Sequence, residues 1–384
     1  MRRIAAWALV LGATHGLAAQ RLAKPVRDTV DHHIVRVTNP GPTSWSDTNG
    51  WKLTYERTIQ PADDSPGMLE HPAGISLLGD GRLVEWDSKT PGINVYDVHG
   101  ALVRKIGRDG EGPGEFRRNE VGLLRDTIVV DDIHLARITV FTIDGRLIRT
   151  MRAPCCDGFP VAVDQRGRAI LHVTTNLRGA FTSHWARVPL GGGSADTIPS
   201  PVAAPPLQWT VHSEHGEAVF RVPFAGQTTM AFQQDGSMIY GATDRAEWLR
   251  SSDGRDTTLI IRISGLVPRP VPAVNRDSLF HLYTDHNEAL RAVAHESDLP
   301  RTYPLWREIG TDDRGDFWIM LGSYFTPITG FAVVDRNGAF LGIVPSPFRA
   351  ASYVSWSGDR VAVADIDDND VPRVRIFRID RRGH

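Results

Sequence analysis

One short unit recurs six times along this chain, and this recurrence limits the fold more than any single motif does. Each copy has an apolar strand, a tight turn that is often Asp-Gly, a second strand, a loop, a third strand and another turn with Gly. The six copies begin at the following apolar segments: Ile75–Leu78, Val121–Leu124, Val161–Val163, Met230–Phe232, Glu308–Gly310 and Tyr353–Trp356. Antiparallel hairpin units repeated in this way are typical of a propeller, in which blades of about four strands surround a central channel. We therefore predict an all-β fold, a six-bladed β-propeller over residues 51–384.

The last copy ends after its third strand, which leaves its blade one strand short. Before the first copy, Trp51–Ile59 (WKLTYERTI) alternates well enough for a strand but belongs to no unit of its own. An open ring would leave unpaired strand edges, which promote aggregation. We therefore predict that this N-terminal strand completes the sixth blade and closes the ring.

Two stretches interrupt the repeat. Residues 195–223, between the third and fourth copies, are rich in Pro and are predicted to form a long surface excursion. Between the fourth and fifth copies, residues 275–299 place apolar side chains like one face of a helix: Leu279, Leu282, Tyr283, Leu290 and Val293. This spacing predicts one helical insertion at about 272–300, packed on one face of the propeller in the position of a lid beside the channel.

The N-terminal segment is typical of a targeting signal. Arg2 and Arg3 precede the apolar run Ile4–Ala13 and a stretch of small residues that ends at Ala19, as in a secretory signal peptide over residues 1–19. The run is too short to span a bilayer, and no later apolar stretch approaches membrane length. Residues 20–50 are polar and lack sustained periodicity, which predicts a partly disordered extension. We expect a protein exported to the periplasm or the cell exterior, without a membrane span.

The charge balance gives no sign of a nucleic-acid partner. The chain has 43 basic and 45 acidic residues, a formal net charge of −2, without the concentrated basic face that nucleic acid requires. The only cysteines, Cys155 and Cys156, are adjacent, so no long-range disulfide is available within the chain. Export favours oxidation, and two alternatives stay open: a vicinal disulfide, or two thiols in a turn. We expect a monomer.

The stretch Lys105–Phe116 (KIGRDGEGPGEF) joins the first two copies and has a glycine density that no core strand would carry. Together with the preceding Ile93–Gly100, it resembles the secreted bacterial six-bladed propellers that are related to NHL repeats and to the TolB-like fold. The resemblance extends through the repeat pattern over residues 51–384. It implies the fold but no single activity, because propellers serve binding, scaffolding and catalysis alike.

Charged side chains in the glycine-rich stretch are candidate ligand contacts. Arg108, Glu111 and Glu115 would present both signs of charge at a blade junction where glycine allows close backbone approach. Alternatively, they pair with one another or with a neighbouring blade and fix the loop. Trp306 is the aromatic candidate, because an indole that lines the channel offers a flat surface to a sugar or peptide, whereas an indole between blades is core.

Candidate metal ligands are few. Asp365, Asp367 and Asn369 have the spacing that opens a calcium loop, but Asp370 stands where such a loop needs Gly, and a polar hairpin is the competing interpretation. No pair of histidines has the spacing and context of a zinc site. We therefore predict no cofactor. A divalent metal, calcium or zinc, is the alternative if channel residues from several blades meet.

No nucleophile motif is present in the sequence. The first hypothesis is therefore an exported, non-enzymatic propeller that binds a protein, peptide or carbohydrate on one face, with the glycine-rich stretch and the helical insertion shaping the site. The alternative is a metal-dependent lyase or hydrolase with its site at the central channel. That alternative requires Asp, Glu or His at the ends of inner strands, facing one another across the axis.

Overall fold

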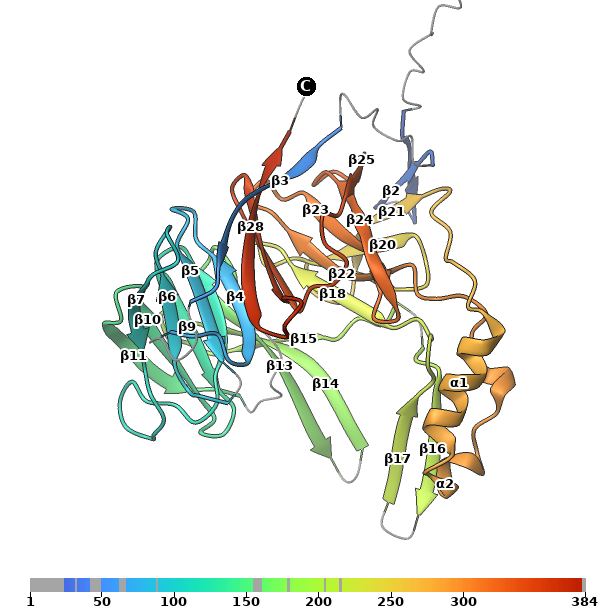
Figure 1. The fold of residues 1–384 in the computed structure, drawn as a ribbon, viewed down its shortest axis with the longest axis horizontal. Coiled ribbons are helices and arrows are strands. Elements are labelled where there is room, and N and C mark those ends of the chain that lie inside the picture. Colours follow the sequence, from blue (N-terminus) through green and yellow to red (C-terminus); the bar gives the residue numbers. More distant parts are fainter. Residues whose placement is uncertain are drawn as a thin grey trace, which may run out of the picture.

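The computed structural model describes residues 24–31, 33–41, 50–61, 67–87, 89–154, 161–177, 180–203, 205–213 and 216–381. Strand pairing arranges most of these residues into six sheets of at least four strands around a centre, which confirms the six-bladed propeller (Figure 1). The signal peptide expected at residues 1–19 lies outside the described residues. Among those described, no helix is both long and apolar enough to cross a membrane.

Each blade is an antiparallel sheet whose strands follow one another from the centre outward. Blades 1 to 3 consist of β4 (Pro72–Leu77), β5 (Leu83–Asp87), β6 (Ile93–Tyr96) and β7 (Leu102–Ile106); β8 (Glu120–Leu124), β9 (Thr127–Asp132), β10 (Arg137–Thr142) and β11 (Leu147–Arg152); and β12 (Ala162–Val163), β13 (Arg168–Leu177), β14 (Ala180–Pro189) and β15 (Asp196–Pro199). Blades 4 to 6 consist of β18 (Thr228–Phe232), β19 (Met238–Ala242), β20 (Glu247–Ser251) and β21 (Thr257–Ile263); β22 (Trp306–Thr311), β23 (Phe317–Ser323), β24 (Thr326–Val334) and β25 (Phe340–Pro345); and β26 (Tyr353–Ser357), β27 (Arg360–Ile366), β28 (Pro372–Asp380) and β3 (Lys52–Ile59).

Apolar side chains between neighbouring blades hold the ring together. Because successive residues of a strand point to opposite faces, a blade between two others buries both of its faces. All seven residues of β23 are buried, for example. Trp318 on β23 stacks on Trp356 of blade 6 with ring centroids 4.4 Å apart. Each such buried side chain stabilises the fold by about 1.5–3 kcal/mol, so the repeated apolar strands specify the stacking of blades.

The ring closes as predicted. β3 pairs antiparallel with β28 from Ile59 opposite Val374 to Lys52 opposite Asp380, and it supplies the fourth strand of blade 6. A second contact ties the same chain ends to blade 5: Arg381 Nη2 lies 2.8 Å from Asp312 Oδ2, and the Arg381 guanidinium carbon lies 5.1 Å from the centre of the Trp51 ring. The closing strand therefore joins two blades as well as completing one.

Part of the N-terminal extension is ordered, at residues 24–31 and 33–41. β1 (Val26–Val30) and β2 (Ile34–Asn39) form a hairpin, and β2 pairs in parallel with β21, so blade 4 has six strands. Val37 is fully buried against the blade 4 core, and Asn39 donates to the carbonyls of Arg262 and Gly338. A segment too short to show periodicity is thus ordered by an edge that the propeller itself provides.

The two stretches that interrupt the repeat are both folded, and they pack on each other. Residues 195–223 contain the hairpin β16 (Gln208–Ser213) and β17 (Gly216–Arg221), where the sequence predicted only an excursion. The helical insertion between blades 4 and 5 is confirmed as α1 (Ala273–Thr284), the short α2 (Glu288–Arg291) and the 3-10 turn Glu296–Asp298. Figure 1 shows the hairpin and the helices side by side, away from the blades. We call them together the lobe.

The lobe has a small core of its own. Trp209 of β16 packs with Leu290, Ala294 and Leu299, and its indole Nε1 donates to Asp298 at 2.8 Å. The predicted apolar helix face is only partly correct, because Leu290 is buried whereas Leu282 is 66% exposed. The helix ends at Thr284, so the residues beyond it do not continue the same face. The insertion therefore packs mainly on the hairpin.

Candidate functional site

Strand parity places every connection between blades on the same side of the propeller. Four antiparallel strands bring the chain back to the side where the blade began, so the connector to the next blade and the loop between the second and third strands share one face. We call this side the connector face. The glycine-rich stretch follows β7, and the hairpin and the helices follow β15 and β21, so all three lie on this face. In Figure 1 the hairpins β13–β14 and β16–β17 extend in the same direction.

The glycine-rich stretch is a cross-linked joint. Arg108 pairs with Glu115 at 2.6 Å, and Glu115 also accepts the backbone N–H of Gly112 at 2.8 Å. These two contacts lower the pKa of Glu115, with the Gly112 hydrogen bond as the first cause. Glu111 pairs with Arg117 at 2.9 Å, and Arg137 of blade 2 donates to the Glu111 carbonyl. The candidates Arg108, Glu111 and Glu115 thus meet in one loop, where they pair as the alternative interpretation expected.

Glycine is required at the start of this joint. Gly107 has φ +72°, and a Cβ there would lie 2.2 Å from the ring of Phe116. Phe116 is fully buried between blades 1 and 2. The joint therefore anchors the chain into the core as it passes from one blade to the next.

Trp306, the aromatic candidate, lies in the core. Its side chain is fully buried between blades 4 and 5, with its ring centroid 5.8 Å from that of Trp248. Its indole Nε1 donates to the Arg245 carbonyl at 2.9 Å. These contacts position the two blades and leave no face of the indole to a ligand.

The three calcium candidates do not form one cluster. Asp365 is buried and pairs with Arg373, at 2.8 Å, and with Arg375. Asp367 accepts the backbone N–H groups of Asn369 and Val371, as the turn of a polar hairpin requires. Across the part of the chain that the structure describes, no group of three or more His, Cys, Asp or Glu side chains is placed to hold a metal ion. Cys155 and Cys156 lie outside the described residues.

Two carboxyl groups lie side by side at the connector end of blade 2. Glu120, the first residue of the innermost strand β8, is directly opposite Asp131 on β9, and both side chains are buried. Burial raises the pKa of each to about 7; the charge of Asp131 adds to the effect on Glu120, and that of Asp132 to the effect on Asp131. No described residue hydrogen-bonds Asp131 Oδ1. A buried carboxylate oxygen without a donor is costly, and together with the raised pKa values it marks this pair as a candidate functional site.

A second charged group approaches the same end of the channel from blade 5. Arg307 and Glu308 lie on the innermost strand β22, with Arg307 Nε 3.0 Å from Glu308 Oε1. The Tyr324 hydroxyl donates to Glu308 at 3.4 Å, and the Arg307 guanidinium lies over the Tyr324 ring, 4.9 Å from its centre. Burial is the main cause that raises the pKa of Glu308. Blade 5 thus contributes a carboxylate, Glu308, that forms an ion pair with the neighbouring Arg307.

Tyr353 is influenced by the charges of both groups. It is the first residue of β26, the innermost strand of blade 6, and burial raises the pKa of its hydroxyl. The charges of Glu120 and Glu308 add to this effect, so both carboxylates lie close enough to act on one hydroxyl. Blades 2 and 5 are three positions apart in a ring of six, which places these groups across the axis from each other. We call Glu120, Asp131, Glu308 and Tyr353 the channel-mouth cluster.

The sequence analysis did not select the channel-mouth cluster. The sequence did contain a signal for these residues. Glu120 begins the otherwise apolar strand EVGLL, and Asp131 lies near the end of the strand TIVVDD. A charged residue in a strand that is buried on both faces needs a partner or a function. The alternation of apolar and polar residues within a strand could not indicate which blades would bring these side chains together.

Comparisons with known proteins find solved structures of similar fold but no related sequence family. No family model matches the chain, and no curated protein matches it. Among solved structures, a candidate exported protein from Bacteroides fragilis is 13% identical, covers 90% of this chain and 99% of its own, and has a TM-score of 0.49. A DUF4221 family member from Bacteroides vulgatus is 10% identical, with 86% and 98% covered and a TM-score of 0.49. Virginiamycin B lyase from Staphylococcus aureus, solved with quinupristin, is 12% identical, with 85% and 99% covered and a TM-score of 0.44. These likenesses are too remote to carry a function to this chain.

Proposed function

We propose that this chain is an exported binding propeller, which takes a peptide or protein segment on its connector face and receives a cationic side chain at the channel mouth. The observation that carries the proposal is the pair Glu120 and Asp131. A buried carboxylate without a described donor is completed by a Lys ammonium or an Arg guanidinium, which supplies both charge and hydrogen bonds.

Exposed aromatic residues beside the cluster support a peptide as the ligand. Tyr324 and Phe325 form the loop between β23 and β24 on the connector face, and they are 68% and 45% exposed. Phe325 is backed by Phe224, with ring centroids 4.7 Å apart, and Phe224 in turn contacts Tyr303. Supported aromatic side chains of this kind dominate the binding energy of protein interfaces. A carbohydrate ligand would use the same rings but has no cation for Glu120 and Asp131.

The proposal is tested with a matched pair of probes. N-acetyl-Ala-Lys-Ala-amide and its Gln counterpart are titrated into the mature protein at pH 8 by calorimetry. We expect the Lys peptide to bind and the Gln peptide to bind at least about tenfold more weakly, because only the former completes the carboxylate pair. Asp131→Asn should remove this preference, and Asp126→Asn, an exposed acid at the opposite end of blade 2, should keep it. Equal binding of the two peptides contradicts the proposal.

The same carboxyl pair predicts how stability depends on pH. Because the folded pKa values of Glu120 and Asp131 are raised to about 7, the folded protein holds protons that the unfolded chain has released. Their stabilising contribution is complete below the unfolded pKa values and is lost as the pH rises through about 7. The double variant Glu120→Gln/Asp131→Asn should flatten the fall in free energy of unfolding between about pH 4 and 7, measured by urea denaturation. Asp126→Asn serves as the control, and a slope unchanged in the double variant would show that these groups are not buried acids.

A second candidate is a lyase or hydrolase at the channel, which one observation favours. Two adjacent carboxyl groups that both titrate near neutrality can share one proton, so one acts as acid and the other as base. In this candidate a divalent metal, calcium or zinc, would have to be held by channel residues. Elemental analysis after exhaustive dialysis tests for the metal, and turnover of ester, lactone or peptide substrates that Asp131→Asn abolishes would favour this candidate.

The proposal also covers the family, the export and the oligomeric state of the protein. Kinship with NHL-repeat and TolB-like propellers, cleavage of residues 1–19 and a monomeric state are consistent with the repeat pattern and the N-terminal composition. N-terminal sequencing of protein recovered from the periplasm or the medium should begin at Gln20. Light scattering should give the mass of one mature chain.

A further inference from the structure

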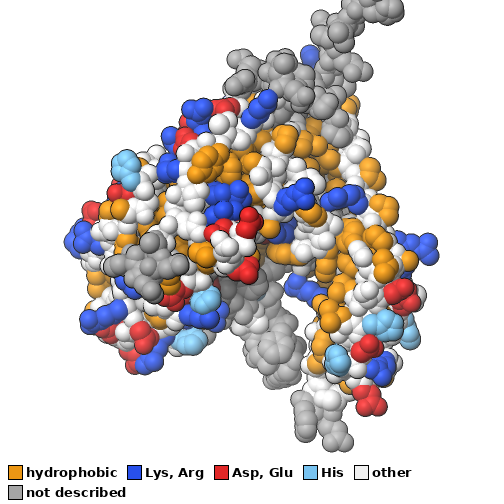
Figure 2. Space-filling view, in the orientation of Figure 1, with side chains coloured by type: hydrophobic (Ala, Val, Ile, Leu, Met, Phe, Trp, Pro, Cys, Tyr) orange, Lys and Arg blue, Asp and Glu red, His pale blue; other side chains and the backbone are white. Residues whose placement is uncertain are grey.

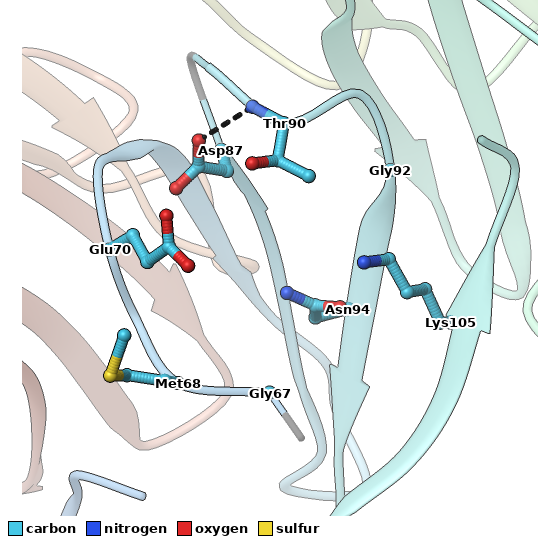
Figure 3. Close-up of a pocket in the computed structure, with 8 residues that line it drawn as sticks. All are labelled: Gly67, Met68, Glu70, Asp87, Thr90, Gly92, Asn94 and Lys105. Carbon is cyan, nitrogen blue, oxygen red and sulfur yellow. Dashed lines mark hydrogen bonds between the residues drawn. The ribbon is translucent and has the colours of Figure 1, made fainter. Parts of the chain in front are cut away.

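Blade 1 contains a separate pocket of about 230 Å³, next to the seam where the ring closes. Its floor is the face of blade 1 that packs toward blade 6, and its rim is the described end of the connector to β4, from Gly67 to Glu70. The Tyr96 hydroxyl donates to the Gly67 carbonyl at 2.6 Å and fixes this connector over the sheet. Figure 3 shows the pocket between the connector on one side and the strands β6 and β7 on the other. We call it the seam pocket.

One side of the seam pocket is acidic. Glu70 lies on the connector, and Asp87 lies at the end of β5. Asp87 accepts the backbone N–H groups of His71, Lys89 and Thr90 at 2.7–2.9 Å, so its carboxylate is held in one orientation. Both residues line the pocket, with Glu70 exposed at the rim and Asp87 buried.

The other side of the seam pocket carries a cation, Lys105, whose charge opposes the effect of burial on the pKa of Glu85. Lys105 on β7 points toward Asn94, and both are drawn opposite Glu70 and Asp87 in Figure 3. Among the residues that the structure describes, Lys105 Nζ has no hydrogen-bond partner and no ion pair. Gly92 leaves room for this side chain, because a Cβ at that position would lie 3.0 Å from Lys105 Cε. The ammonium group is therefore free to receive an anion.

The floor between the two sides is polar and incompletely satisfied. Asn94 donates Nδ2 to the Glu85 carboxylate at 2.9 Å, and Glu85 is 1% exposed. Asn94 Oδ1 and Glu85 Oε1 are both buried and have no hydrogen-bond partner. Buried oxygens without donors are rare in folded proteins. Of these two residues, Asn94 lines the cavity, and Glu85 lies behind it.

We infer that the seam pocket binds a small zwitterion of the size of an α-amino acid, with its ammonium toward Glu70 and Asp87 and its carboxylate on Lys105. The separation of acidic and basic sides across Asn94 selects a ligand that carries both charges. The volume is below the roughly 300–1,000 Å³ of drug-sized sites, which limits the ligand to a small molecule. This site is independent of the channel-mouth cluster, since no residue is shared between them.

The test uses probes that differ only in charge. Glycine and L-alanine are titrated into the mature Glu120→Gln/Asp131→Asn variant, in which this pair at the channel mouth no longer offers carboxylates to an ammonium, and followed by calorimetry and ligand-observed NMR, with acetate and ethylamine as single-charge controls. We expect at least one amino acid to bind with a Kd of about a millimolar or tighter, and both controls to bind at least about tenfold more weakly. If neither amino acid binds, or if acetate or ethylamine binds as well, the inference is wrong.

Two variants assign the binding to the seam pocket. Lys105→Met and Glu70→Gln should each weaken amino-acid binding about tenfold or more, because each removes one charge-assisted hydrogen bond. Arg104→Met removes a neighbouring cation from the same strand outside the pocket and should bind like the unmodified protein. Glu120→Gln should also leave amino-acid binding unchanged, which separates this site from the channel mouth. Equal binding by Lys105→Met and the unmodified protein would overturn the assignment.

Discussion

Removal of residues 1–60 is expected to abolish cooperative folding, because it deletes the closing strand of the propeller. Without β3, blade 6 keeps three strands, and β28 loses its partner from Val374 to Asp380. The deletion also removes Ile59 and Trp51, which are buried in the cores beside blades 1 and 5. Each such side chain contributes about 1.5–3 kcal/mol, against a typical total stability of about 5–15 kcal/mol.

Thermal melting and size-exclusion chromatography measure this effect. The truncated chain should show no sharp transition and should elute as aggregates, because an unpaired edge of β28 recruits other chains. Removal of residues 1–23 retains every described strand and serves as the control, which should melt like the mature protein. A chain without β3 that still melts sharply within a few degrees of the control would mean that closure does not depend on this strand.

Arg381→Ala is expected to cost about 3 kcal/mol of unfolding free energy, the lower end of the loss for a broken buried ion pair. The Asp312 carboxylate has no exposed surface and would remain buried without its guanidinium partner. Three N–H donors remain to it, from Arg314, Asp316 and the Trp318 indole, and they moderate the loss. Urea denaturation measures the difference.

Arg378→Ala is the matched control for Arg381→Ala. Arg378 pairs with Asp380 at 2.9 Å, but its side chain is 50% exposed, so its removal should cost about 0–1 kcal/mol. Asp312→Asn in the Arg381→Ala background should recover part of the loss, because it removes the unpaired charge. Equal losses in Arg381→Ala and Arg378→Ala would mean that the Asp312 pair is solvated in solution.

The blades could be predicted from the sequence because their signals are local. Asp97 accepts the N–H groups of His99 and Ala101 in the turn before β7, and turns with Asp and Gly recur in the other blades. Between such turns, strands of alternating or continuous apolar residues leave few other folds open. The role of β3 was also predictable, since a single unpaired strand and a single incomplete blade must match.

The added elements could not be predicted because their partners are distant in sequence. β2 is ordered by parallel pairing with β21, and nothing in residues 34–39 points to that strand. The hairpin β16–β17 is stabilised by Trp209 packing on Leu290 and Leu299 of the helical insertion. For the same reason Leu282 misled the helix prediction: the packing partner lies on one side of α1 only, and Leu282 is 66% exposed on another side.

The candidate site was predicted less well than the fold. Sequence reasoning selected the charges of the glycine-rich stretch, which pair with one another in a joint. It did not select Glu120 or Glu308, because these two carboxylates come near each other only when the folded ring brings blades 2 and 5 face to face. Sites in propellers combine residues from non-adjacent repeats. The spacing of residues within one repeat therefore does not predict which residues meet in the site.

The pairing of the N-terminal strands sets the order in which this protein can assemble. β2 and β3 precede all the blades in the chain, yet they pair with β21 of blade 4 and with β28 near the C-terminus. A chain threaded through a membrane from its N-terminus would deliver these strands first and their partners last. Pairs so distant in sequence form slowly, and until they form the early strands remain open edges. The propeller therefore closes only after nearly the whole chain has emerged.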